Sequence, residues 1–114
     1  MPAASNTPRD SRRHYRIRYP LRLRPRLEVA GLYAVVIDLS EGGVRIVNEA
    51  QLPLAPGAVV KGALVLQSGE AARFSGSVVR VTPEDIALCL AQGFSYAVIL
   101  REQRRLRARR PYLR

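Results

Sequence analysis

A strict alternation of apolar and charged residues near the start of the chain constrains its fold more than any other feature. Between residues 16 and 29, arginine or glutamate occupies most even positions, and the apolar residues occupy odd ones: Ile17, Tyr19, Leu21, Leu23, Leu27 and Val29. A period of two predicts a half-buried β-strand, here with a basic outer face. Pro20 and Pro25 cannot donate to a strand ladder, so this strand is predicted to lie at an edge or to bend there.

Short strands continue through most of the chain. Five more are predicted, from apolar runs bounded by turn residues, at 32–38, 44–48, 59–67, 72–81 and 86–90. Glycine-containing turns at 39–43 and 68–70 join two pairs of these strands as hairpins. Strands this short lose their open edges most simply by closing into a barrel. We therefore expect an all-β fold, a six-stranded antiparallel β-barrel over about residues 16–91.

The two ends of the chain differ from this pattern. Residues 1–11 are polar, contain proline and lack periodicity, which predicts a flexible arm. Ser95 is a good N-cap, and the apolar residues after it fall on one helical stripe: Tyr96, Ile99, Leu100 and Leu106. Arginines from Arg101 onward suit the negative end of a helix, and Pro111 ends it. One C-terminal α-helix is therefore expected at about 96–110, where it would cover one opening of the barrel.

Charge is divided unevenly along the chain. The 114 residues carry a net charge of +10, to which residues 1–30 and 101–114 contribute +6 each and residues 31–100 contribute −2. Basic ends favour an anionic partner such as a nucleotide, a nucleic acid or an acidic protein surface. A GC-rich genome would also favour arginine over lysine, but it would not explain the acidic middle.

The chain offers little from which to build an enzyme. His14 is its only histidine, and no histidine, cysteine or carboxylate cluster has metal-ligand spacing. Cys89, the only cysteine, is expected to be an inert thiol buried in an apolar strand. Glu84 and Asp85 follow a turn proline and are expected to be solvated. No signal peptide is recognisable, and no apolar run reaches the ~18 residues that span a bilayer. We therefore expect a cytoplasmic protein without catalytic activity, cofactor, metal or membrane insertion.

Two short motifs remain as candidate binding elements. The first is Arg12-Arg13-His14-Tyr15-Arg16, whose guanidinium groups suit phosphates and the O6 and N7 edge of guanine. A solvated basic face is the alternative. The second is Asp38-Leu39-Ser40-Glu41-Gly42-Gly43, at a predicted hairpin turn, where a carboxylate can accept from guanine N1–H and N2–H. The alternative is a turn in which Asp38 and Ser40 bond their own backbone.

Together the two motifs resemble the signature of the PilZ domain family, an RRxxR element followed about twenty residues later by DxSxxG. The matching residues are Arg12, Arg13, Arg16, Asp38, Ser40 and Gly43. The resemblance runs from about Arg9 onward and implies a PilZ domain at 12–114. It implies a barrel that binds cyclic di-GMP on its outside, with arginines on phosphates and guanine faces, and with the aspartate and serine on guanine edges. One departure is Ala87, near which family members often have a glycine, and it bears on the local path of the last strand.

A mode of action follows on physical grounds, because strands would hold Asp38, Ser40 and Gly43 while Arg12 and Arg13 end a flexible arm. Ligand binding would order the basic arm across the barrel, and the arm would signal to an effector protein in motility, chemosensory, biofilm or exopolysaccharide control. The effector, and the binding of one nucleotide or two, stay open. One alternative is a basic β-barrel that binds RNA or DNA. It is disfavoured because Tyr19 and Tyr33 are expected to point inward, whereas such surfaces usually interleave stacking aromatics. Another is a PilZ-type module that has lost its ligand, which the intact motifs disfavour.

Overall fold

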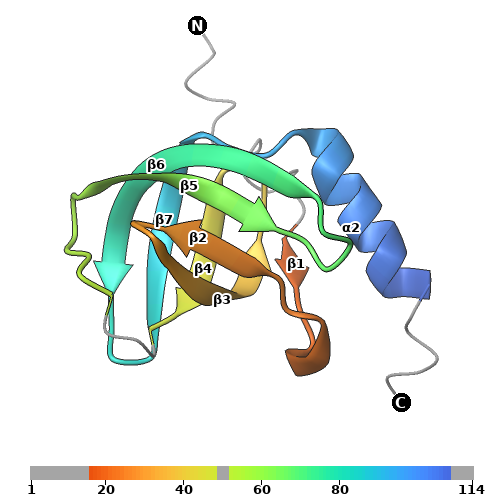
Figure 1. Cartoon of the computed structure of the whole chain (residues 1–114), viewed down its shortest axis with the longest axis horizontal. Helices are drawn as coiled ribbons and strands as arrows, with labels where there is room; N and C mark the ends of the chain where they lie inside the picture. The colour runs from red at the N-terminus through yellow and green to blue at the C-terminus, as the bar shows by residue number, and fades with distance from the viewer. Residues whose placement is uncertain (1–15, 49–51, 109–114) are drawn as a thin grey trace, which may run out of the picture.

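Six strands of the chain close into an antiparallel barrel, and one helix follows them (Figure 1). The computed structural model describes residues 16–48 and 52–108. The elements are β1 (Ile17–Arg18), the 3₁₀ turn η1 (Leu21–Leu23), β2 (Arg26–Val29), β3 (Leu32–Leu39), β4 (Gly43–Val47), β5 (Val59–Val65), β6 (Ala71–Val81), β7 (Asp85–Gln92) and α2 (Tyr96–Ala108). Backbone pairing runs around the barrel in the order β2, β5, β6, β7, β4, β3 and returns to β2. The predicted fold class, an all-β barrel of six strands with a C-terminal helix, is confirmed.

The predicted first strand is interrupted. Its two parts, β1 and β2, count as one barrel strand because both pair with β3. Pro20 precedes η1, in which the backbone N–H of Leu23 donates to the carbonyl of Pro20 at 2.9 Å. A 3₁₀ turn does not keep a period of two. The alternation therefore fails at Leu21, which is 78% exposed instead of buried.

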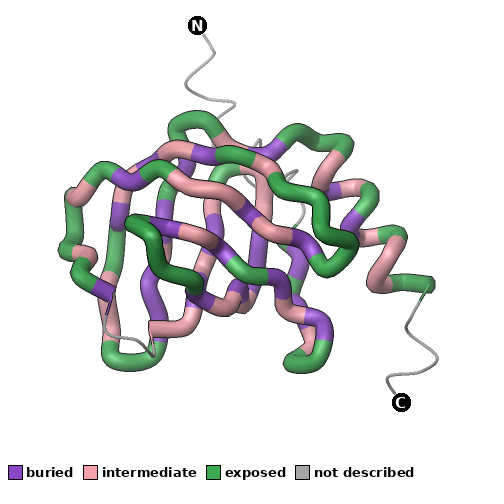
Figure 2. Tube along the Cα trace, in the orientation of Figure 1, coloured by how far each residue is buried: buried purple, intermediate pink, exposed green. Residues whose placement is uncertain are grey.

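The inner faces of the strands form one apolar core (Figure 2). Fully buried side chains come from every side of the barrel, among them Leu27, Val36, Ile46, Leu64 and Ile86. Each such side chain contributes about 1.5–3 kcal/mol when it is removed from water. Because one face of every strand is committed to this core, the register of the strands is fixed, and so is the set of side chains on the outer face.

Tyr33 is one of those outward side chains, contrary to expectation. In β3 the inward positions are Ala34 and Val36, so Tyr33 lies on the outer face opposite Glu28 of β2. Its ring is exposed, and the guanidinium carbon of Arg26 lies 5.4 Å from the ring centroid. Sequence alternation alone could not assign this residue, because nearly all of β3 is apolar.

Helix α2 begins as predicted. The hydroxyl of Ser95 accepts a hydrogen bond from the backbone N–H of Val98 at 3.3 Å, which is the contact of an N-cap. Ile99 is buried against the core, whereas Tyr96, expected on the same stripe, is half exposed. The predicted helix end near residue 110 and Pro111 lie outside the described residues, as does the predicted arm at 1–11.

A buried carboxylate fastens α2 to the barrel. The hydroxyl of Tyr19 donates to Oε1 of Glu102 at 2.7 Å, and Nε and Nη2 of Arg105 each donate to this carboxylate at 3.0 Å. Burial and the hydrogen bond to Glu102 raise the pKa of Tyr19 far above its ordinary value. The helix therefore packs beside β1.

Candidate functional site

A cleft of about 400 Å³ opens on the outer face of the barrel. It lies over β3, β4, β6 and β7, and charged side chains around it include Arg16, Asp38, Arg45 and Arg80. Its lining thus carries three arginines and one carboxylate, a balance suited to an anionic ligand with hydrogen-bond donors.

Backbone pairing aligns four cleft residues in one row across these strands. Asp38 of β3 lies opposite Arg45 of β4, Arg45 lies opposite Ala87 of β7, and Ala87 lies opposite Arg80 of β6. Ala87 is in the middle of the row, and its small side chain leaves the space above it open. Ala87 pairs regularly with Arg45, whereas a register shift in β6, between Val78 and Arg80, directly precedes its pairing with Arg80.

Two β-bulges turn the ends of this row outward. Asp38 has the same parity as Val36, which points into the core, but the register shift between them makes Ile37 an extra residue. In β6 a second shift between Val78 and Arg80 has the same effect. Bulges commonly re-aim a side chain next to a binding site. Without these two irregularities Asp38 and Arg80 would face the apolar interior.

The β3–β4 turn closes one end of the cleft. The backbone N–H of Ser40 donates to the carbonyl of Gly43 at 2.9 Å, and the Ser40 hydroxyl lies 3.4 Å from the same oxygen. A Cβ on Gly43 would lie 3.3 Å from the backbone oxygen of Leu88, so glycine allows β7 to pass close by. The alternative of a self-bonded turn thus holds for Ser40, whereas the carboxylate of Asp38 bonds to arginines instead.

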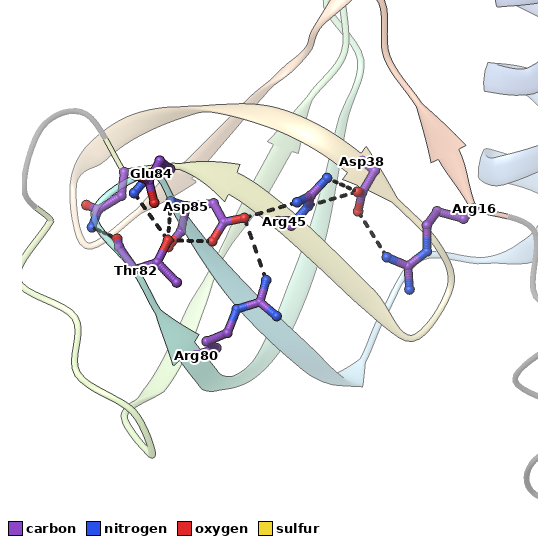
Figure 3. A network of polar contacts seen from close by, with 8 residues as sticks. Arg16, Asp38, Arg45, Arg80, Thr82, Glu84 and Asp85 are labelled. Carbon is purple, nitrogen blue, oxygen red and sulfur yellow. Dashed lines mark hydrogen bonds and ion pairs between the residues drawn. The ribbon is translucent and has the colours of Figure 1, made fainter.

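Asp38 is the electrostatic centre of the cleft (Figure 3). It is 3% exposed, and Nε and Nη2 of Arg45 both lie 2.9 Å from its Oδ2. Nη1 of Arg16 lies 3.5 Å from Oδ1, a long contact made by a side chain that is 64% exposed. Burial alone would lower the pKa of Arg45, but the charges and hydrogen bonds of Asp38 and Asp85 outweigh it and raise that pKa.

Asp85 holds the other side of Arg45. Nη1 of Arg45 lies 3.0 Å from Oδ2 of Asp85, while the hydroxyl of Thr82 donates to Oδ1 at 2.9 Å. The hydrogen bond from Thr82 is the main cause that lowers the pKa of Asp85, and Arg45 and Arg80 lower it further. The expectation that Asp85 is solvated is therefore wrong, because the turn at 82–85 folds it back against the barrel.

Four of the six residues predicted from the motifs lie around this one cleft: Arg16, Asp38, Ser40 and Gly43. Arg12 and Arg13 lie outside the described residues. Cys89 was expected to be buried, but it is exposed and lines the cleft. Side chains alternate between the two faces of β7, so Cys89 lies on the same outer face as Ala87, while Leu88 and Leu90 point into the core.

Arg45 and Arg80 were missed by the motif analysis. Both belong to the acidic middle of the chain, where arginines are few, and this scarcity was the available signal. Their partners could not be inferred from sequence, because the contacts depend on strand register and on the bulges.

A comparison with protein families identifies the domain. A profile of the PilZ domain matches residues 10–109. The chain belongs to the PilZ domain family. A search of curated proteins found no match. PilZ domains are a family of cyclic di-GMP receptors rather than catalysts, and this PilZ domain carries the family's barrel and terminal helix.

Two further findings concern other kinds of site. Within residues 16–48 and 52–108, no cluster of three or more histidine, cysteine or carboxylate side chains could hold a metal ion. In the same part of this PilZ domain, none of the helices has the length and apolar character needed to cross a membrane.

Proposed function

We propose that this PilZ domain binds cyclic di-GMP in the cleft over β3, β4, β6 and β7, and that it passes the signal to an effector protein without catalysing a reaction. The observation that carries the proposal is that Arg16 lies around the same open cleft as Asp38, Ser40 and Gly43, although at least 22 residues separate it from them in sequence. The exposed arginines Arg16 and Arg80 match a ligand with two phosphates, and the single carboxylate matches the N–H edge of guanine.

Each residue has a role that its geometry suits. Asp38 accepts from guanine N1–H and N2–H, and Gly43 lets the ligand approach the backbone. Arg16 moves from Asp38 to a phosphate. The exchange costs little because its present contact is long, at 3.5 Å, and its side chain is largely in water. Arg12 and Arg13 are proposed to contact phosphates and guanine faces as well.

A nucleic-acid surface is the competing function. The exposed Tyr33 removes one objection to it, because an aromatic ring does lie on the basic face. Among the described aromatic residues, however, the exposed ones are Tyr33 on β3 and Tyr96 on α2, and Arg26 already covers the first. Stacking platforms present successive rings along a groove. The cleft with its carboxylate therefore favours a guanine nucleotide.

Titration calorimetry with cyclic di-GMP tests the proposal directly. We expect micromolar or tighter affinity, about −8 kcal/mol or better, and the same titration gives the number of nucleotides bound. Absence of heat at ~100 μM ligand, together with no displacement of a fluorescent cyclic di-GMP, would show that the cleft does not bind this nucleotide.

A further inference from the structure

We propose that Arg45 is a positioning residue for guanine recognition, which acts by holding the carboxylate of Asp38 in one orientation. The inference rests on the proposed function and adds a residue outside the family signature. It starts from the row of paired residues, in which Arg45 lies directly between Asp38 and Ala87.

The contacts of Arg45 leave one oxygen of Asp38 available. Nε of Arg45 donates a hydrogen bond to Oδ2 at 2.9 Å, and Nη2 forms an ion pair with the same oxygen at 2.9 Å, while among the described residues Oδ1 has only the 3.5 Å contact with Arg16. Two donors on one oxygen restrict rotation of the carboxylate. Each carboxylate oxygen can accept about two hydrogen bonds, so Oδ1 is the oxygen left to accept from the N–H edge of guanine once Arg16 moves away.

Arg45 is itself held in place. Nη1 is bonded to Asp85 at 3.0 Å, and Asp85 is fixed in turn by the Thr82 hydroxyl at 2.9 Å. The side chains of its two carboxylate partners, Asp38 and Asp85, are only 5% and 12% exposed, so Arg45 cannot turn to a phosphate without giving up its contact with a largely buried carboxylate. Arg45 therefore acts on the ligand through Asp38.

Arg80 provides the matched comparison. It lines the same cleft and contacts the same Asp85, but at 3.6 Å, with a side chain that is 56% exposed, and the structure gives it no contact with Asp38. Arg80 can swing toward a phosphate. Its effect on binding should therefore not depend on Asp38.

The experiment is a pair of double-mutant cycles. Arg45→Gln and Arg80→Gln are each made in the wild-type chain and in Asp38→Ala, and affinity for cyclic di-GMP is measured by calorimetry and competition at physiological salt. We expect Arg45→Gln to weaken binding about tenfold or more in the wild-type chain, and less than about twofold once Asp38 is gone. Arg80→Gln should weaken binding by the same factor in both backgrounds. An equal loss for Arg45→Gln with and without Asp38, or no loss at all, would overturn the proposal.

The ratio of affinities for two cyclic dinucleotides with different bases gives a second test, because loss of a positive charge alone would not change that ratio. Cyclic di-IMP carries the same phosphates but lacks the N2 amines. Arg45→Gln should reduce the preference for cyclic di-GMP over cyclic di-IMP, whereas Arg80→Gln should preserve it. An unchanged preference in Arg45→Gln would contradict a positioning role. Should Arg45→Gln fail to fold, Arg45→Lys takes its place, since an ammonium keeps the charge but cannot grip both carboxylates with a planar fork.

A ligand-free measurement separates this inference from the proposed function. Three-bond NMR couplings report the side-chain rotamer of Asp38. We expect one χ1 rotamer in the wild-type chain and in Arg80→Gln, and averaging between rotamers in Arg45→Gln or Arg45→Lys. A single rotamer in both Arg45 variants would overturn the positioning role. If the rotamer result holds but the wild-type chain binds no cyclic di-GMP, the proposed function fails and the positioning of Asp38 stands.

Discussion

At the scale of single residues, Arg16 and Asp38 differ in how firmly their side chains are held. Asp38 is buried and bonded to Arg45, whereas Arg16 is largely exposed and loosely paired. The motif spacing alone was enough to predict that these two residues meet. It could not predict which partner would be fixed and which would be exchangeable, because that difference depends on the bulge at Ile37 and on Arg45, which the motif does not contain.

Replacement of Arg16 tests whether its side chain moves from Asp38 to a phosphate of the ligand. Arg16→Ala should weaken cyclic di-GMP binding by about 1.5–3 kcal/mol, the usual worth of a charge-assisted contact. Arg104→Ala, on the exposed side of α2, removes the same charge and should change affinity by less than about 0.5 kcal/mol. Calorimetry of both variants at physiological salt decides between a site and general attraction. Equal losses of affinity in the two variants would instead indicate general electrostatic attraction of the ligand.

Ala87 tests the position of the cleft. Its side chain faces outward between Arg45 and Arg80, so Ala87→Leu should fill the cleft and abolish binding while the core stays intact. A surface change of this kind alters the free energy of unfolding by only about 0.5 kcal/mol. Ala63→Leu is the matched control, because Ala63 also lies outside the core, on β5, and does not line this cleft. Calorimetry and urea unfolding of both variants check the prediction; retained binding in Ala87→Leu would place the ligand elsewhere.

At the scale of elements, periodicity predicted the hairpins and the helix start correctly but not the faces of every residue. The assignment failed for Leu21 because a turn interrupts its strand. It failed for Tyr33 and Cys89 because apolar residues in their strands occupy both the odd and the even positions. In such runs the inward set is decided by the register of the neighbouring strands. The attachment of α2 was also not predictable, since the hydrogen bond between Tyr19 and Glu102 spans 83 residues.

The attachment of α2 yields an element-scale prediction. Arg105→Ala leaves the buried Glu102 without its cationic partner and should destabilise the protein by about 2–3 kcal/mol. Tyr19→Phe removes one hydrogen bond and should cost about 1–2 kcal/mol. The control is Arg101→Ala, which breaks an exposed pair with Glu70 and should cost less than about 1 kcal/mol. Urea unfolding measures all three. If Arg101→Ala lowered the free energy of unfolding as much as Arg105→Ala, the buried Glu102 contact would not be what attaches α2 to the barrel.

The same contact predicts a pH dependence. Because the pKa of Tyr19 is raised in the folded state, the unfolded tyrosine ionises first, near pH 10. The stability that this contact contributes is therefore fully present below about pH 10 and is lost as pH rises above it. Tyr19→Phe should show a smaller alkaline loss of stability than the wild-type chain, measured by urea unfolding between neutral pH and pH 11. Parallel alkaline losses in the two proteins would exclude Tyr19 as the source.

At the scale of the whole molecule, closure of the barrel follows from a property visible in the sequence: many short strands and few residues with which to cover their edges. Closure brings β4 of the first hairpin beside β7, the last strand, and so assembles a cleft from segments about 40 residues apart. Which strands would become neighbours was not readable from periodicity, because each strand alone is compatible with several orders.

The net charge of +10 raises a whole-molecule question, namely whether a dinucleotide binds by its bases or by its charge. Cyclic di-AMP has the same two phosphates as cyclic di-GMP, but adenine offers an unprotonated N1 and no N2 amine. The carboxylate of Asp38 would then be buried against an acceptor, at a cost of about 1–3 kcal/mol. We therefore expect at least tenfold weaker binding of cyclic di-AMP, since about 1.4 kcal/mol corresponds to a factor of ten.

Charge attraction alone makes the opposite prediction. Both dinucleotides would bind alike, and both would weaken steeply with salt. A competition assay at two salt concentrations separates the accounts, with Asp38→Ala as the variant that removes base reading and keeps the arginines. In that variant the guanine preference should disappear while salt dependence stays, because the charges that attract the phosphates are unchanged. Comparable affinity of the wild-type chain for both dinucleotides, or an undiminished guanine preference in Asp38→Ala, would remove Asp38 from the site.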